Sequence, residues 1–373
     1  MREFGYKVSI VLSVYSSDLL IQDAKLIKGQ GITTYRISDL SVRNARSITD
    51  KIIYKLGRIA IQYFGLETVF GLGYGAYRYL AFCKNLKADL FICHQEMATY
   101  AGMKLIRSGA KVGFDFEDWY SEDLLPAERA RRPLSLLRKA EAYALRHASF
   151  VYTTSHILAR TLADHYKSKL PEVIYNMFPA YSLAKSKQFN APLKLFWFSQ
   201  TIGPGRGLEA FIGILKKVAI PIELHLLGKV SLTYKITLQQ LADSTAVYFH
   251  DVIPPDELHH KISTFDIGLA LEMSYPASRN LTITNKLFQY MQAGLPVIAT
   301  TTAGQREIFE KINPGFMLAG GNLSDDIEGL RTWLEDSRQL MQARYHAIDF
   351  AEKHNWETES LKLNQIISRV FET

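Results

Sequence analysis

Apolar positions along this chain follow two alternating patterns. Short runs rich in β-branched and aromatic residues, typical of buried strands, are separated by longer stretches with the three-to-four residue spacing of amphipathic helices. In the first half, the runs that predict strands are Val8–Val14, Asp89–His94, Lys111–Phe116 and Phe150–Thr154. In the second half, they are Leu193–Ser199, Ile222–Gly228, Ala246–Asp251, Asp266–Glu272 and Leu295–Thr301. This alternation indicates βαβ units and parallel sheets, and therefore an α/β fold.

Helical spacing fills much of the sequence between these runs. Met97–Ser108 and Leu134–Leu145 are clear cases, and the long, basic, apolar segment Ala45–Leu86 is expected to be helical where its glycines permit. The polar stretch Ser182–Pro192 ends in proline and is typical of a linker.

The linker and the two series of strands predict two Rossmann-like domains with parallel sheets that face each other across a cleft. We expect a first domain over residues 1–187 and a second over residues 188–352. The amphipathic helix predicted over residues 353–373 either pads the second domain or packs back on the first. Ligands of such sheets bind at the carboxyl ends of the strands, so the loops there are the places to search for a site.

Length and composition suit this interpretation. A chain of 373 residues is long enough for two ordinary cores, and 47% apolar with 22% charged residues is typical of a soluble globular protein. No apolar run reaches the roughly 20 residues of a membrane span, and the N-terminal run predicts a strand rather than a signal peptide. Cys83 and Cys93 cannot form a disulfide framework, which suits a reducing, cytoplasmic location, and their spacing predicts no structural zinc.

Charge is distributed unevenly between the halves. Residues 1–187 carry 27 Lys and Arg against 17 Asp and Glu, whereas residues 188–373 carry 17 against 20. The resulting net charges of +10 and −3 suggest an anionic partner for the first half. This partner could be the anionic inner face of a membrane or an anionic acceptor. The alternative is that the basic surface has no partner and only meets solvent. Nucleic acid is not expected, because the sequence has no zinc-finger spacing and no RNA-binding signature.

A glycine-rich turn between a strand and a helix is the first candidate site. The sequence SQTIGPGRGLEAF (Ser199–Phe211) has neither the dinucleotide-binding GxGxxG spacing nor that of a P-loop. Its glycines, Gly203 among them, would let backbone approach a ligand closely, and Arg206 offers a forked donor to phosphate oxygens. A plain tight turn is the alternative.

The second candidate is TNKLFQYMQAGLPVIAT (Thr284–Thr300), which predicts a helix, a glycine stop at Gly294 and a buried strand. Helix N-termini carry unpaired N–H groups and positive potential, which suit a phosphate. Asn285 and Lys286 lie in the first turn, where Lys286 could neutralise a diphosphate. An ordinary surface lysine on an amphipathic helix is the alternative.

Together these stretches resemble glycosyltransferase family 4, also called glycosyl transferases group 1, which has the GT-B fold. Arg206-Gly207 matches the family's basic-Gly pair, and NKLFQYMQAGLPVIAT is similar to its run ending in E-x-M-A-x-G-x-P-V. At three family positions this sequence departs from the pattern. Thr201 stands in place of an arginine, Gln289 in place of the ribose-binding glutamate, and Leu281 in place of a second glutamate. Glu272 at a strand end is the nearest carboxylate that could take the last role.

The resemblance extends into the first half and covers most of residues 85–310. The family's acceptor loop commonly has Asp-x-His-Glu, whereas this chain has Asp115-Phe116-Glu117-Asp118, with an acid in place of the histidine. The segment Tyr143–Pro179 is similar to the family's closing segment, with Asn176 and Pro179 before the linker. In the second half, Glu307 matches the family's Gly-x-x-Glu turn.

The resemblance implies transfer of a sugar from a nucleotide diphosphate donor to a hydroxyl of a glycan or lipid-linked acceptor, with retention at the anomeric carbon. Thr201, Gly203, Arg206, Glu272, Asn285, Lys286 and Gln289 would bind the donor. Glu117 or Asp118 would orient the acceptor hydroxyl or take its proton. The fixed positive charges imply that neither a metal ion nor another cofactor is required. A GT-B-fold epimerase and a non-catalytic subunit that binds sugar nucleotides or glycans remain alternatives.

Overall fold

The computed structural model describes residues 1–183, 187–243, 245–321 and 323–372, so three residues of the predicted linker, 184–186, lie outside the described residues. Packing divides the chain into two compact units. The N-terminal unit comprises Met1–Thr153, Ala159–Val173 and the chain from Ser360 onward, and the C-terminal unit comprises Thr154–Leu158 and Ile174–Glu359.

The units are interleaved along the chain, and this division differs from the one expected at the linker. Tyr175 lies in the C-terminal unit because its hydroxyl donates to Glu307 at 3.0 Å and its backbone N–H to Glu359 at 3.1 Å. Both carboxylates come from later segments of the same unit. The packing partners of residues 174–183 therefore place them there, although they precede the polar linker in sequence.

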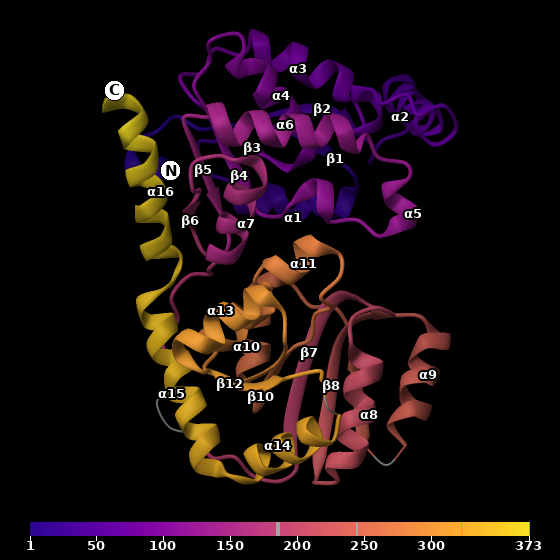
Figure 1. Cartoon of the computed structure of the whole chain (residues 1–373), viewed down its shortest axis with the longest axis vertical. Coiled ribbons are helices and arrows are strands. Elements are labelled where there is room, and N and C mark those ends of the chain that lie inside the picture. Colours follow the sequence, from indigo (N-terminus) through magenta and orange to yellow (C-terminus); the bar gives the residue numbers. More distant parts are fainter. Residues whose placement is uncertain (184–186, 244, 322, 373) are drawn as a thin grey trace. The chain divides into compact units, whose positions relative to one another are not determined.

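The N-terminal unit is built on parallel strands in two groups, β1-β2 and β3-β4-β5-β6 (Figure 1). The strands are β1 (Ser9–Val14), β2 (Thr33–Asp39), β3 (Phe91–His94), β4 (Val112–Phe116), β5 (Phe150–Thr153) and β6 (Glu172–Val173). The helices are η1 (Arg2–Phe4), α1 (Ser17–Ile27), α2 (Ala45–Phe64), η2 (Val69–Gly71), α3 (Ala76–Asn85), α4 (Gln95–Ile106), η3 (Tyr120–Glu122), α5 (Pro126–Arg129), α6 (Leu134–His147) and α7 (His156–Tyr166).

The C-terminal unit contains one six-stranded sheet with the order β12-β11-β10-β7-β8-β9, in which all neighbouring strands are parallel. The strands are β7 (Leu193–Ile202), β8 (Ile222–Val230), β9 (Ala246–His250), β10 (Ile267–Ala270), β11 (Val297–Thr300) and β12 (Gly315–Leu318). The helices are α8 (Leu208–Val218), α9 (Leu232–Ala242), α10 (Pro255–Ser263), α11 (Ala277–Leu281), α12 (Asn285–Gln292), α13 (Ala303–Ile312), α14 (Leu323–Glu335) and α15 (Ser337–Lys353). The last helix, α16 (Trp356–Glu372), begins in this unit and continues into the N-terminal unit.

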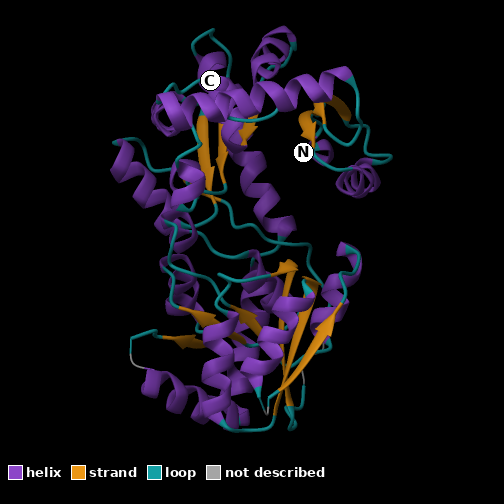
Figure 2. Ribbon diagram, turned by 90° about the vertical axis from the view of Figure 1, so that its right-hand side faces the viewer, coloured by secondary structure: helices purple, strands orange, loops and turns teal. Residues whose placement is uncertain are grey.

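The apolar runs of the second half supply the core between this sheet and its helices. Leu195, Trp197 and Leu269 on the strands are fully buried, and so is Leu208 on α8. Figure 2 shows the strands of this sheet among the helices that cover them. Every strand predicted from the sequence is present, and the α/β class with parallel sheets is confirmed.

The last helix, α16, shown in yellow in Figure 1, has residues in both units. In the N-terminal unit, the Lys111 ammonium donates to the carbonyl of Val370 at 2.7 Å. Arg369 pairs with Glu172 at 2.6 Å, and the Tyr6 ring lies 6.4 Å from that of Phe371. The end of α16 is thus part of the packing of the N-terminal unit.

In the part of the chain that the structure describes, no helix combines the length and the apolarity that crossing a membrane requires.

Candidate functional site

The glycine-rich turn lies between β7 and α8 in the C-terminal unit. Gly205 and Gly207 have φ angles of 75° and 77°, in the left-handed region where a side chain is disfavoured. A Cβ on Gly207 would lie 3.5 Å from the Cβ of Leu271, just beyond β10. The turn therefore lies beside the end of β10, and it contains Gly203 and the half-buried Arg206. Thr201 is exposed near the end of β7, opposite Lys229 of β8.

Helix α12 packs directly against β10. A Cβ on Gly268 of β10 would lie 2.1 Å from the ring of Tyr290, which is fully buried, so only glycine permits this approach. The contact fixes α12 with its N-terminus at the loop edge of the sheet. Asn285 and Lys286 of its first turn thus lie at the same edge as the end of β10.

Glu272 and Lys286 meet at this edge. The Lys286 ammonium lies 2.8 Å from Oε1 of Glu272, and only 11% and 13% of the two side chains are exposed. The Thr284 hydroxyl donates to the same oxygen at 3.1 Å, and the backbone N–H of Glu272 donates to the Thr300 hydroxyl at 2.7 Å. The Lys286 ammonium also lies 5.6 Å from the Trp197 ring centroid, within cation–π range. The structure therefore holds the Lys286 ammonium at the N-terminus of α12, paired with the Glu272 carboxylate.

The other donor residues predicted on α12 have different surroundings. Asn285 is exposed and its side chain accepts a hydrogen bond from Asn176 at 2.9 Å. Gln289 lies one turn further along and is half-buried. Between β10 and α12 lies the short helix α11, which follows Pro276 and includes Leu281. Glu307 accepts from the Ile157 N–H at 2.9 Å as well as from Tyr175, and so has a role in the packing of this unit.

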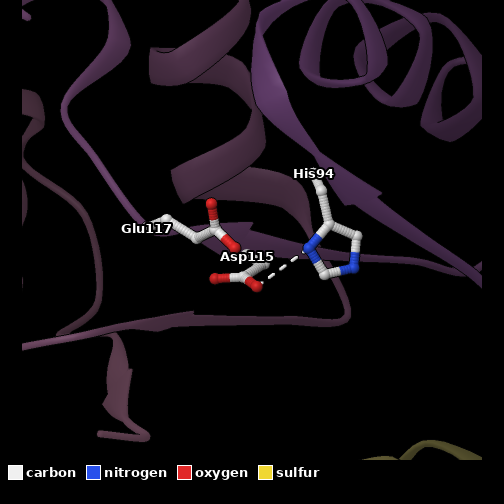
Figure 3. Close-up of side chains that lie close together, drawn as sticks. All are labelled: His94, Asp115 and Glu117. Atoms are coloured by element: carbon white, nitrogen blue, oxygen red, sulfur yellow. Dashed lines mark ion pairs between the residues drawn. The ribbon is translucent and has the colours of Figure 1, made fainter. Parts of the chain in front are cut away.

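In the N-terminal unit, the predicted acceptor loop begins at β4, and His94 joins it from the neighbouring strand. His94 ends β3 and is the register partner of Asp115 on β4. Its Nδ1 lies 2.8 Å from Oδ2 of Asp115 (Figure 3). Gln95, which has a left-handed φ of 69°, donates through Nε2 to Glu117 at 3.2 Å. His94 and the predicted residue Glu117 thus lie around the buried Asp115, and Asp118 follows on the half-buried loop.

The pKa values of Glu117 and His94 are shifted by burial and by the charges of this cluster. Burial, followed by the negative charge of Asp115, raises the pKa of Glu117, while His94 and the Gln95 hydrogen bond act in the opposite direction. For His94, burial alone would lower the pKa, but the hydrogen bond and charge of Asp115, together with the charge of Glu117, outweigh it and raise the pKa. A carboxyl group whose pKa is moved toward neutrality suits proton transfer.

His94 was not among the residues predicted from the sequence. The loop has an acid where the related family often has histidine, and the structure supplies a histidine from the adjacent strand instead. The sequence could have indicated His94. It is the last residue of a predicted strand, as Phe116 is of another, and the carboxyl ends of parallel strands lie at one edge of a sheet.

Within the described residues, His94, Asp115 and Glu117 form the one group of histidine, cysteine and carboxylate side chains close enough to hold a metal ion, with ligand atoms within 4.8 Å of one another. In this group, however, Nδ1 of His94 is hydrogen-bonded to Oδ2 of Asp115, so these two ligand atoms are directed at each other. The observed arrangement is therefore that of a hydrogen-bonded acid–base pair.

Comparisons with known proteins give one family match and several similar solved structures. Residues 195–336 match the family Glycosyl transferases group 1. A search of curated protein sequences gives no match. Among solved structures, sucrose-phosphate synthase from Thermosynechococcus elongatus superposes with a TM-score of 0.65 at 15% identity, over 82% of this chain and 79% of that one.

Two further structures match over nearly their whole length. HepE from Anabaena, in complex with UDP, gives a TM-score of 0.64 at 16% identity, covering 98% of this chain and 100% of that one. A glycosyltransferase from Rickettsia africae gives 0.60 at 14% identity, covering 98% and 99%. The chain therefore has the GT-B fold of two Rossmann-like domains. Residues 195–336, which contain the glycine-rich turn, Glu272 and Lys286, are similar to the Glycosyl transferases group 1 family.

Proposed function

We propose that this protein transfers a sugar from a nucleotide diphosphate donor to a hydroxyl of a glycan or lipid-linked acceptor. The observation that carries the proposal is the Glu272–Lys286 pair at the N-terminus of α12, beside the glycine-rich turn and inside the matched glycosyltransferase domain. The HepE structures in complex with UDP and UDP-glucose make uridine nucleotides the first donors to test.

In the proposed reaction, the bond between the anomeric carbon and the diphosphate breaks while the acceptor oxygen bonds to that carbon, with retention of configuration. Arg206, Lys286 and the N-terminus of α12 stabilise the negative charge that develops on the departing diphosphate. Glu272 holds the Lys286 ammonium in place. Glu117 orients the acceptor hydroxyl and takes its proton, and Asp118 assists from the same loop.

Thermal-shift measurements with UDP-, GDP-, ADP- and CMP-sugars test donor binding, and product analysis with and without added acceptor tests the reaction. Binding of one nucleotide class and transfer only with acceptor support the proposal. Isomerisation or hydrolysis of the donor without acceptor would show an epimerase instead. Donor binding with no turnover under any condition would show a non-catalytic binding subunit.

Transfer is expected to persist in excess EDTA. The reason is that Arg206, Lys286 and the α12 N-terminus supply fixed positive charge where other enzymes use a divalent ion. The measurement is the initial rate after chelation, with Mg²⁺ or Mn²⁺ added back as the control. Activity that is lost on chelation and returns with either ion would contradict metal independence.

Changing His94 to Gln is expected to shift the pH dependence of kcat/KM. Glu117 must be ionised to accept a proton, so its pKa sets the acidic limb of the profile. Because His94 lowers the pKa of Glu117, removing its charge raises that pKa and moves the limb to higher pH. Activity lost at acidic pH should therefore return as the pH rises. His147→Gln, elsewhere in the same unit, is the control, and a limb that stays in place would refute this positioning role.

A further inference from the structure

The outer face of α2 is apolar. Ile48, Ile52 and Leu56, spaced at intervals of four residues, are 44%, 52% and 58% exposed and form one stripe along the helix. The exposed rings of Tyr63 and Phe64 continue the apolar surface at the end of the helix. Large side chains gathered in this way are uncommon on a face that meets only water.

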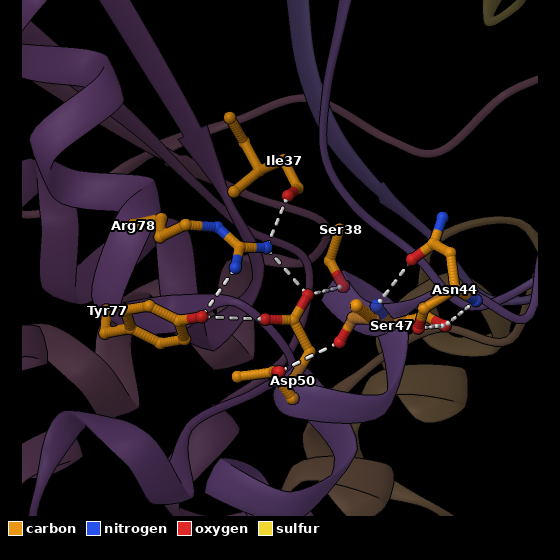
Figure 4. Close-up of polar contacts among 9 residues, drawn as sticks. Ile37, Ser38, Asn44, Ser47, Asp50, Tyr77 and Arg78 are labelled. Atoms are coloured by element: carbon orange, nitrogen blue, oxygen red, sulfur yellow. Dashed lines mark hydrogen bonds and ion pairs between the residues drawn. The ribbon is translucent and has the colours of Figure 1, made fainter.

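Buried polar contacts on the inner face of α2 fix the orientation of the helix. Asp50 is fully buried, and its carboxylate accepts from Ser38 at 2.6 Å and from Tyr77 at 3.1 Å (Figure 4). Arg78 forms an ion pair with it at 2.7 Å. A rotation of α2 that buried the stripe would remove Asp50 from these partners and leave Arg78 without its carboxylate, a costly change inside a protein.

Close packing on the same side reinforces this orientation. A Cβ on Gly57 would lie 2.8 Å from the backbone of Phe70, so α2 rests directly on the segment that follows it. The capping box between Asn44 and Ser47 sets where the helix begins, with the Ser47 N–H donating to Asn44 at 2.9 Å. The apolar stripe is therefore held outward by the fold.

Positive charge borders the stripe. Lys51 and Lys55 are exposed on α2, and Arg43 and Arg46 are exposed at its start. The helix contains a single acidic residue, Asp50, which is buried and paired with Arg78. The solvent-facing side of α2 thus combines apolar side chains with cations, in a half of the chain whose net charge is +10.

We infer that the outer face of α2 docks on an anionic lipid bilayer. An amphipathic helix with apolar residues on one side and flanking lysines lies in the plane of a membrane interface, with its apolar side chains among the acyl chains and its cations at the head groups. This charge complementarity favours a bilayer over a second protein surface. The inference deepens the proposed function by naming where a lipid-linked acceptor would meet the protein, but docking can be measured without transfer.

Sedimentation with vesicles tests the inference. The full chain should bind vesicles of phosphatidylcholine and phosphatidylglycerol in about equal parts, bind little to phosphatidylcholine alone, and lose binding as salt shortens the Debye length. Replacing Ile52 and Leu56 together by Ser, or Lys51 and Lys55 together by Gln, should each weaken binding about tenfold or more.

The matched control is Leu232→Ser with Ile236→Ser, an exposed apolar pair at the same spacing on α9 of the C-terminal unit. It should bind vesicles as the unchanged protein does. Equal binding to neutral and anionic vesicles, or full binding by both α2 variants, would overturn the inference. So would a dimer in sedimentation velocity that the Ile52→Ser, Leu56→Ser change dissociates, because the face would then be a protein contact.

Nucleotide affinity, measured on the same variants, separates the two proposals. Lysine and apolar changes on α2 should leave it unchanged, since the donor residues lie in the C-terminal unit. Vesicle binding without any nucleotide binding would support the docking surface and contradict the proposed donor site.

Discussion

Turnover is expected to fall about 100-fold or more when Glu117 is changed to Gln or Asp118 to Asn. The lower bound is the usual effect of losing a positioned proton-transfer group. Glu117 is the stronger candidate, because burial and the charge of Asp115 raise its pKa and His94 lies beside it. Steady-state rates at saturating donor measure the effect, and nucleotide affinity should stay nearly unchanged.

Glu128→Gln serves as the matched control, since Glu128 is an exposed acid of the same unit that pairs with Arg58. Circular dichroism on all three variants separates loss of chemistry from loss of folding. Full turnover in both loop variants would place the acceptor chemistry elsewhere. A loss that appears equally in the control would point to a general effect of charge in this unit.

The second large effect is expected on donor binding. Lys286→Ala and Arg206→Ala should each weaken nucleotide affinity by about 1.5–3 kcal/mol, the range for a lost charge-assisted hydrogen bond, or about 10- to 150-fold in Kd. The effect of Lys286→Ala should be the larger of the two. Without its partner, the Glu272 carboxylate remains next to the diphosphate and repels it.

A double variant isolates this repulsion. Glu272→Gln added to Lys286→Ala should recover part of the lost affinity, because the uncompensated carboxylate is gone. Isothermal titration with the nucleotide identified by thermal shift is the measurement, and Lys217→Ala on the exposed last turn of α8 is the control. Unchanged affinity in both single variants would remove Arg206 and Lys286 from the donor site.

Local pattern explains which parts of the fold could be predicted. β10 was foreseeable because Ile267–Ala270 is a continuous buried run, and α12 because a glycine stop follows its helical spacing. Strands β2, β6 and β12 were not predicted from the sequence. Polar residues interrupt β2, β6 has only two residues, and β12 is a four-residue strand that begins at Gly315, directly after Pro314. None of the three gives the long, uninterrupted apolar run that predicted the other strands.

The residues of the candidate site also fall into two groups, those that local sequence motifs predict and those that only the fold brings together. Arg206 and Lys286 belong to local motifs, so sequence alone pointed to them. The contact of His94 with Asp115 depends on the register of two parallel strands, which short-range pattern does not define. The outward face of α2 is a similar case: periodicity shows that the helix has two sides, but the long-range contacts of Asp50 with Ser38 and Arg78 decide which one is inside.

The return of α16 into the N-terminal unit determines how this protein can be dissected. A fragment that ended at residue 173 would retain Lys111 and Glu172 but not their partners, the carbonyl of Val370 and Arg369. The Tyr6 ring would also lose Phe371. Neither unit is a continuous stretch of sequence, so a single cleavage cannot yield both intact. Joining residues 360–372 to the end of residues 1–173 through a flexible linker is the rational way to obtain the N-terminal unit alone.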